Sequence, residues 1–422
     1  LYGLDDEDTF NVIGEQKNII PLRIIGGQNN DTYIAESDKR LSIFDYKSKK
    51  NTFNTKKQNL KLTDNYDTNV YNYKKLKYSR NQIIPFIGSN PDDGVKIGIK
   101  NTFTVYGFKR NPFTQQHSLN AAYYFATKGF DLNYSMEFAN IINKWNFYLN
   151  TRITSPNYSI KYFGFGNNTL NYEDDFGEDF HRVKISTFSV NPSFKWVGRQ
   201  GAHFKIGAFY ENLEVENTNN RFINSFPAII ENGKSYVGVN SNYSYENYDN
   251  KSFPTLGMSF HFKTGWKMNS EDSKENNAFI NPSLSFDYKL IPSGNLVLAT
   301  KFNGNIIIGD NFEFYNAASI GGNNGLRGYR NQRFIGNSSY YQNTDLRLNL
   351  RKVKTELVPL QLGIFGGFDY GRVWEKNANS SDWKTSYGGG FWLVAANMVN
   401  FNISVFESQE GPYFKFGLGF GF

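Results

Sequence analysis

The side chains best suited to metal or acid–base chemistry are few in this sequence. There are four histidines, His117, His181, His203 and His261, and the absence of cysteine excludes disulfides and thiolate metal sites. No histidine stands in the Asp-x-His or Gly-Asn-His setting that a two-metal phosphoesterase needs, and Asp310 is an isolated fragment of such a motif. No Gly-x-Ser-x-Gly or phosphate-binding glycine motif occurs. The sequence therefore predicts a protein that is not an enzyme.

A different chemistry is suggested by the glycine-rich stretch 309–338, which contains Leu326-Arg327-Gly328-Tyr329. An arginine held in a confined interior keeps a desolvation cost unless a carboxylate meets it. Glycines would let the chain turn tightly and press against a neighbouring wall. The alternative is that Arg327 is a solvated surface arginine.

Carboxylates near the N-terminus suggest a metal site. Residues 26–34, Gly-Gly-Gln-Asn-Asn-Asp-Thr-Tyr-Ile, resemble one nonapeptide of the calcium-binding β-roll, and residues 3–11 are a poorer copy 23 residues earlier. Asp8 and Asp31 are the candidate calcium ligands. The alternative is a small β-rich segment that turns without metal, and elsewhere the chain predicts no cofactor.

The elements that would hold these residues are β-strands. Aromatic residues make up 17% of the chain although only 39% is hydrophobic, which is typical of a transmembrane barrel with one apolar and one polar face. From about residue 94 the chain alternates apolar and polar residues, in segments separated by turns. Sixteen segments are marked, the first near 94–109, the fifth near 157–166 and the last near 412–422. We therefore expect an all-β, sixteen-stranded antiparallel outer-membrane barrel with a small N-terminal β-rich and linker segment.

The connections between these segments alternate in length. Residues 127–129, 155–157, 249–251 and 292–295 read as tight turns, expected on the periplasmic side. Residues 167–180, 216–233, 267–275 and 309–338 are long and are expected outside the cell. The predicted organisation is a degenerate β-roll-like repeat segment over 1–45, a polar linker over 46–90 and a transmembrane barrel over 91–422.

The last strand shows the alternation most clearly. One face carries only large apolar residues and the other carries Lys415 and the glycines Gly417, Gly419 and Gly421. The apolar residues would face lipid: Phe414, Phe416, Leu418, Phe420 and Phe422. Their pattern resembles the C-terminal insertion signal by which the outer-membrane insertion machinery recognises its substrates. The glycines favour a weak or bendable seam between the first and last strands, or they merely fit a crowded interior.

The net charge of +7 is scattered over segments that read as strands, so nucleic acid is not expected as a partner. The partners expected from this reading are outer-membrane lipids and lipopolysaccharide.

The segment Leu326-Arg327-Gly328-Tyr329 resembles the sixth-loop motif of the superfamily of BamA, TamA and the two-partner-secretion transporters, also called the bacterial surface antigen family. Thr344-Asp345-Leu346-Arg347 is similar to the acidic-x-Arg strand after that loop, and Phe368-Asp369-Tyr370-Gly371 resembles the F-x-D-x-G motif of the following strand. Alternation places Asp345, Arg347 and Asp369 on the interior face of their strands, with Leu346 on the outer face. The resemblance implies that Arg327 pairs with Asp369 inside the barrel.

The resemblance implies insertion or translocation of polypeptides, with the first and last strands as a lateral gate. The partners would be unfolded outer-membrane proteins or a passenger domain. No POTRA-like α/β pattern precedes residue 94, and segments such as 90–94 look most like Bacteroidetes barrels fused to a metallophosphoesterase. Two alternatives therefore stay open: a non-catalytic anchor or export conduit for an upstream enzyme domain, and an accessory subunit of an envelope assembly complex.

Overall fold

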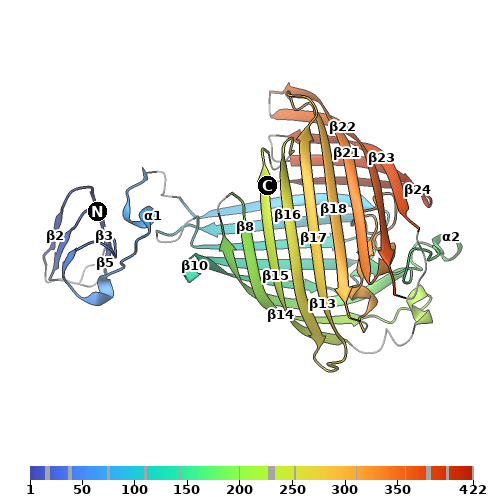
Figure 1. Cartoon of the computed structure of the whole chain (residues 1–422), viewed down its shortest axis with the longest axis horizontal. Helices are drawn as coiled ribbons and strands as arrows, with labels where there is room; N and C mark the ends of the chain where they lie inside the picture. The colour runs from blue at the N-terminus through green and yellow to red at the C-terminus, as the bar shows by residue number, and fades with distance from the viewer. Residues whose placement is uncertain are drawn as a thin grey trace. The chain divides into compact units, whose positions relative to one another are not determined.

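The computed structural model describes residues 1–14, 20–36, 40–73, 77–108, 112–142, 144–198, 200–226, 233–250, 253–309, 311–356, 358–376, 382–395 and 399–420. The chain divides into two compact units, residues 1–80 with 104–115, and residues 81–103 with 116–422 (Figure 1). The first is a small β-structure and the second is a barrel.

The N-terminal unit winds through two parallel sheets. One contains β1 (Tyr2–Leu4), β3 (Leu22–Gly27) and β5 (Leu41–Phe44), and the other contains β2 (Thr9–Val12), β4 (Thr32–Ala35) and β6 (Thr52–Asn54). A 3₁₀ turn, η1 (Lys57–Asn59), and a single helical turn, α1 (Tyr66–Asn69), follow. Equivalent rings of successive coils stack, with 5.3 Å between the centroids of Phe10 and Tyr33 and again between Tyr33 and Phe53. Repeating short strands joined by Asn- and Asp-rich turns therefore form a coil, with the aromatic stack in its core.

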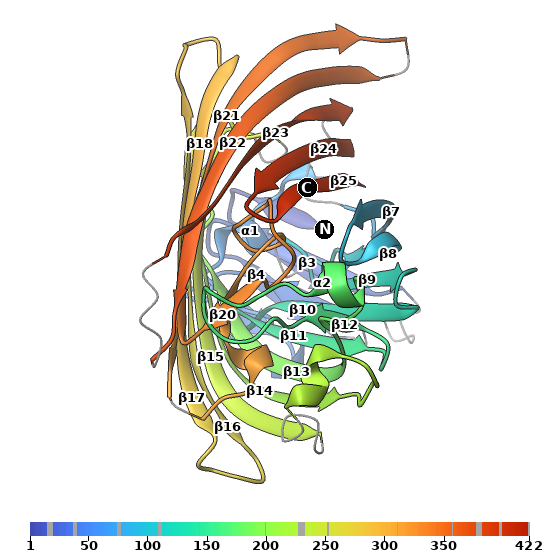
Figure 2. The same ribbon diagram turned by 90° about the vertical axis from the view of Figure 1, so that its right-hand side faces the viewer.

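The second unit is a closed antiparallel barrel of sixteen spanning strands, as the alternation predicted (Figure 2). The spanning strands are β7 (Arg80–Asn90), β8 (Gly94–Val105), β9 (Gln115–Tyr124), β10 (Gly129–Ile142), β11 (Trp145–Thr154), β13 (Arg182–Val197), β14 (His203–Val215), β15 (Lys234–Tyr248), β16 (Gly257–Asn269), β17 (Asn276–Lys289), β18 (Leu296–Ile308), β21 (Ser338–Lys354), β22 (Pro359–Trp374), β23 (Lys384–Ala395), β24 (Val399–Ser408) and β25 (Gly411–Phe420). Neighbours in sequence are neighbours in the sheet, and β25 closes the ring on β7.

The alternation places apolar side chains on the outside of the wall. In β8, Val95, Ile97 and Ile99 are each more than 40% exposed, and in β21 Leu346 and Leu350 are exposed in the same way. In β22 Ile364 and Phe368 are exposed, whereas Asp369 is fully buried. Side chains of a strand point alternately to opposite faces, so a two-residue period is sufficient to sort the lipid face from the interior.

Two strand assignments differ from the sequence prediction, although the total is confirmed. The barrel begins with β7, which falls in the segment predicted as linker; Pro85 lacks a donor for the strand ladder and makes a strand hard to recognise. Residues 157–166 were predicted as a spanning strand, but only β12 (Ser159–Lys161) forms there. Gly164 and Gly166 have φ values of +93° and +103°, so the backbone beyond β12 does not stay extended as far as residue 166.

The omission of β7 also shifted the predicted sides of two turns. Counted from β7, the turn at 127–128 follows the third spanning strand and the segment from 155 onward follows the fifth. Both therefore lie at the same end of the barrel as the long connections, which follow the fifth, seventh, ninth and eleventh strands. The turns at 249–256 and 290–295 lie at the opposite end, as predicted. Among the described residues, no helix combines the length and the hydrophobicity that a bilayer crossing requires.

Candidate functional site: the lumen loop and the seam

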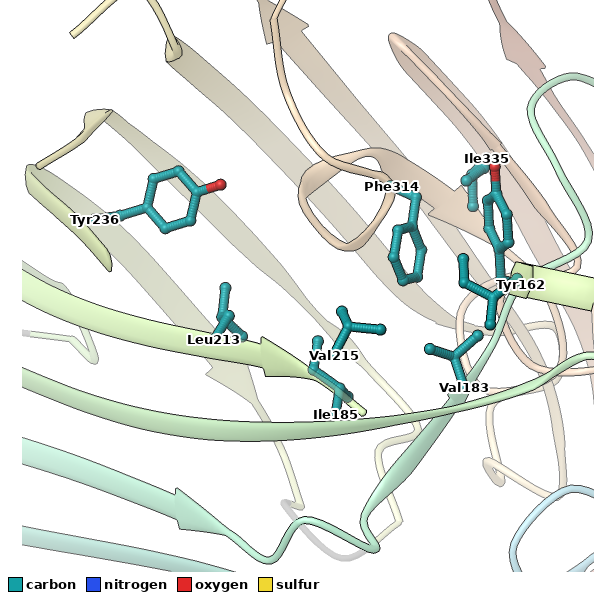
Figure 3. Packing of buried hydrophobic residues seen from close by; sticks show 9 residues of the cluster. Tyr162, Val183, Ile185, Leu213, Val215, Tyr236, Phe314 and Ile335 are labelled. Atoms are coloured by element: carbon teal, nitrogen blue, oxygen red, sulfur yellow. The ribbon is translucent and has the colours of Figure 1, made fainter. Parts of the chain in front are cut away.

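The connection from β18 to β21, residues 309–337, is called the lumen loop here; its residue 310 lies outside the described residues. It contains a 3₁₀ turn, η5 (Phe314–Asn316), and a short hairpin of β19 (Ala318–Ile320) and β20 (Phe334–Gly336). Figure 3 shows Phe314 and Ile335 of the loop packed among side chains of the β13–β15 wall and Tyr162. Apolar packing therefore folds the loop into the barrel interior, the lumen.

A second apolar cluster fixes the tip of the loop. Leu326 and Tyr329 are almost completely buried, and they pack with Ile320 and Phe334 of the hairpin and with Tyr341 and Val373 of the wall. The two side chains that flank Arg327-Gly328 thus hold this dipeptide against β21 and β22. Gly328 is needed for that approach, because a Cβ there would lie 2.8 Å from Cβ of Ser386 and 2.9 Å from the carbonyl oxygen of Glu407.

Arg327 and Asp369 are in direct contact. The guanidinium donates from Nε and Nη2 to both oxygens of Asp369, at 2.6–3.1 Å, and the backbone N–H of Arg327 donates to Oδ2 at 3.0 Å. Asp369 also accepts from Asn343 Nδ2 at 2.6 Å and from Ser386 Oγ at 2.9 Å. A fully buried carboxylate is stable only when several donors hydrogen-bond to it, and Asp369 has them from the wall and from the loop. Asp369 is therefore the binding partner of Arg327 in the barrel wall.

The pair continues into a chain of charges along the wall. Nη2 of Arg327 lies 2.7 Å from Asp345, Arg347 lies 3.7 Å from the same carboxylate, and Arg347 donates to Asp287 at 2.9 Å. The guanidinium of Arg327 also lies over the ring of Phe406, 4.1 Å from its centroid. Asp345 and Arg347 therefore face the interior beside Arg327, where the sequence placed them.

Two further loop arginines were missed in the sequence. Nε of Arg330 forms an ion pair with Glu173 at 2.7 Å, and the guanidinium lies 3.6 Å from Asp92 in the β7–β8 turn. Arg333 donates to Glu410 in the β24–β25 turn at 2.6 Å and to Thr169. Each arginine of the three-residue spacing 327, 330 and 333 thus meets a different part of the barrel. The regular spacing of the three arginines could have indicated that Arg330 and Arg333 are also functional. Their partners could not be found in this way, because they lie far from the loop in the sequence.

Asp92 is the most connected of the missed residues. It is 4% exposed, accepts from Tyr413 Oη at 2.8 Å and from the backbone N–H of Asn331 at 2.7 Å, and lies 3.8 Å from Lys161 Nζ. Burial raises the pKa of the Asp92 carboxyl above its usual range, and Lys161 acts in the opposite direction. Through Asp92, the β7–β8 turn is therefore hydrogen-bonded to both β25 and the lumen loop.

The seam between β25 and β7 has little backbone pairing. Within the described residues the two strands pair only from Phe416 opposite Ser89 to Leu418 opposite Ile87. By contrast, β24 pairs with β25 along its whole length, from Val399 to Ser408. Gly417 faces Gly88 in the paired stretch, so little side-chain bulk fills the interior side there. The contacts of Asp92 with Tyr413 therefore supplement a short backbone ladder at one end of the seam.

The structure describes only some of the residues of the predicted insertion signal. Phe414 and Leu418 are exposed on the outer face of β25, alternating with Tyr413, Lys415 and Gly417. The side chain of Phe420, together with Gly421 and Phe422, lies outside the described residues. A role of this strand as an insertion signal stays a prediction.

The predicted calcium ligands lie in a ladder of coil turns. Asp31 is buried and accepts from the backbone N–H of Asp8 at 2.9 Å, while its own N–H donates to Asn51 at 2.8 Å. Tyr33 donates to Asp45, and Asp45 is fully buried. Among the described residues no group of three or more His, Cys, Asp or Glu side chains is arranged to hold a metal. Calcium binding at Asp8 and Asp31 stays a prediction.

Comparison with known proteins agrees with this architecture. The family model of the haemolysin secretion/activation protein ShlB/FhaC/HecB matches residues 212–393. No curated protein sequence matches the chain. BamA from Haemophilus ducreyi lacking POTRA domains 1–3 is similar in structure, with a TM-score of 0.60 and 13% identity, over 82% of this chain and 71% of that chain.

Two secretion-type barrels are also similar in structure at 11% identity. CdiB from Acinetobacter baumannii has a TM-score of 0.53 over 82% of this chain, and CdiB from Escherichia coli has a TM-score of 0.52 over 80%. The chain spans 60% and 63% of those two proteins. Together, the family match and the fold support the superfamily of BamA and the two-partner-secretion transporters, and the chain is an outer-membrane β-barrel of that architecture.

Proposed function

We propose that this barrel delivers polypeptides into or across the outer membrane, with the β25–β7 seam as a lateral gate. The observation that carries the proposal is the short backbone pairing of the seam, from Ile87 to Ser89 on β7, in a ring whose neighbouring strands β24 and β25 pair along their length. A ladder with few hydrogen bonds is the part of a closed sheet that opens at least cost, and a polypeptide with unpaired strand edges can add to it.

The lumen loop supports the same proposal. Arg327 ties the loop to β21 and β22, while Arg330 and Arg333 reach Asp92 and Glu410 in the turns on either side of the seam. The loop therefore links the fixed wall to both flanks of the gate. Substrates in this proposal are unfolded outer-membrane proteins or a secreted passenger.

The gate can be tested with disulfides because the chain has no native cysteine. Ser89→Cys with Phe416→Cys places two thiols at directly paired positions across the seam, within the Cα separation that a disulfide accepts. Val405→Cys with Phe414→Cys is the matched control across β24 and β25. The barrel is reconstituted in liposomes, and the folding rate of an added unfolded eight-stranded outer-membrane protein is measured.

Oxidation of the seam pair should slow insertion of the client, reduction should restore it, and the control pair should have no effect. Equal rates for the oxidised and reduced seam pair, in a barrel that accelerates folding, would reject the gate. A barrel without any effect on the client would favour the two other candidates, an anchor or conduit for an upstream metallophosphoesterase-like domain, or an accessory subunit of an assembly complex. Co-purification of envelope proteins with the wild-type barrel would favour the subunit.

A further inference from the structure

A row of basic and amide side chains crosses the inner wall from β13 to β17. The strand register sets Lys195 opposite Lys205, Lys205 opposite Asn242, Asn242 opposite Lys263, and Lys263 opposite Asn281. Directly paired residues of antiparallel strands point to the same face. The neighbours Ile206 and Trp266 are exposed on the outer face, so the row faces the lumen.

The charges in this row are unequally compensated. Lys195 donates to Glu137 at 2.8 Å, and Lys267, four residues beyond Lys263 on β16, lies 3.5 Å from Glu211. Lys205 and Lys263 contact rings instead, with Nζ 4.7 Å from the centroid of Tyr148 and 5.4 Å from that of Phe279. Within the described ranges, neither ammonium group has a carboxylate within ion-pair distance.

The same two lysines line a lumen cavity of about 650 Å³ whose charged side chains are three lysines and one glutamate, a net charge of +2. A second lumen cavity, of about 520 Å³, is balanced, because Lys301 and two arginines face three carboxylates there. The excess positive charge is therefore local to the first cavity. Walls of low dielectric constant concentrate such a field within a confined lumen.

Unused hydrogen-bonding groups lie in the same cavity. Asn277 pairs with Lys267 across β16 and β17, lines the cavity and is 2% exposed. Neither its amide nitrogen nor its amide oxygen has a hydrogen-bond partner among the described residues, and the same is true of Oδ1 of Asn242. Buried amides without partners are rare in proteins. A ligand that carries acceptor atoms could accept from Nδ2 of Asn277, whereas the two amide oxygens require a donor.

We propose that this cavity is an oxyanion-binding site, with Lys205 and Lys263 as its cationic ligands. The two lysines stand two strands apart, about 10 Å between backbones, so one phosphate or carboxylate between them lies within reach of both side chains. The shared ligand chemistry is an oxyanion, carried either by a free phosphate compound or by an acidic side chain of a polypeptide in the lumen. This inference is independent of whether the seam opens.

The test measures protection of lysines from an amine-reactive acylating reagent in the solubilised full chain. Modification rates of Lys205, Lys263 and Lys301 are determined by mass spectrometry, with inorganic pyrophosphate, with a hexaglutamate peptide, or with potassium chloride at equal ionic strength. Lys301 is the internal control because it lines the balanced cavity. At twice its dissociation constant, an oxyanion should slow acylation of Lys205 and Lys263 about threefold and leave Lys301 unchanged.

Protection by pyrophosphate alone would identify a free phosphate as the ligand, and protection by both probes would identify a site that also accepts polypeptide carboxylates. Lys263→Gln should abolish the protection of Lys205, whereas Lys301→Gln should not. Equal rates at Lys205 with chloride and with either oxyanion would overturn the proposal. Equal protection of all three lysines would also overturn it, because it indicates general screening in place of a site.

Discussion

Loss of the Arg327 guanidinium should destabilise the barrel through Asp369. Removing one member of a buried ion pair typically costs 3–5 kcal/mol. Asp369 would keep the donors of Asn343 and Ser386 and the backbone N–H of residue 327. Arg327→Ala should therefore lie near the lower end of that range, at about 3 kcal/mol of unfolding free energy.

The reverse substitution, Asp369→Ala, removes the binding partner but leaves Arg327 with Asp345 at 2.7 Å. We expect a loss of similar size, about 3 kcal/mol. Since both single variants break the hydrogen bonds between the guanidinium and the Asp369 carboxylate, the double variant should lose clearly less than the sum, with a coupling energy of about 2 kcal/mol.

Urea unfolding of the full chain in lipid micelles measures these values, followed by tryptophan fluorescence and by the shifted electrophoretic mobility of the folded barrel. Lys289 and Asp249 provide a matched control cycle, because their ion pair at 3.5 Å has side chains that are 33% and 34% exposed. Its coupling should stay below about 1 kcal/mol. Additive effects at Arg327 and Asp369, within the error of the control cycle, would refute the reasoning that the pair acts as one buried unit.

Three further predictions concern the Asp345–Arg327 contact, the buried His181 and the seam. Gly367→Ala should lower the free energy of unfolding by about 1–3 kcal/mol in the same urea assay. The reason is that the added Cβ would lie 2.5 Å from the Asp345 carboxylate. Gly366→Ala is the control and should be nearly neutral, because the nearest atom to its Cβ is 3.9 Å away. Burial lowers the pKa of His181 to about 4, so its neutral form stabilises the fold above its unfolded pKa of about 6.5. That stabilisation should be lost as pH falls from 6.5 towards 4, seen as faster hydrogen exchange around residue 181, and His181→Gln should flatten the dependence. Tyr413→Phe removes the hydroxyl that donates to Asp92, so hydrogen exchange in the β7–β8 turn should accelerate; unchanged exchange would show that this contact does not hold the seam.

Much of the barrel could be predicted because its pattern is local. Strand geometry alone sends alternate residues to opposite faces, so Leu346 and Asp345 were assigned to outside and inside without any knowledge of their neighbours. The number of strands was predicted correctly, but β7 was missed and 157–166 was included. A proline in one segment and left-handed glycines in the other changed the backbone in ways that composition does not reveal.

The lumen site shows the same division. Alternation put Asp369 in the interior, and a resemblance connected it with Arg327, while the wall donors to Asp369, Asn343 and Ser386, came only from strand register. The partners of Arg330 and Arg333 were not predicted.

The sequence by itself thus determined which face of each strand meets lipid and which residues could carry charge into the lumen. Tertiary structure decided which carboxylates Arg330 and Arg333 meet, how little of β7 pairs with β25, and that Lys205 and Lys263 stand in one row without a counter-charge among the described residues. The reason is physical. Alternation is set by adjacent residues, but ion pairs and register depend on how segments a hundred or more residues apart close around a common interior.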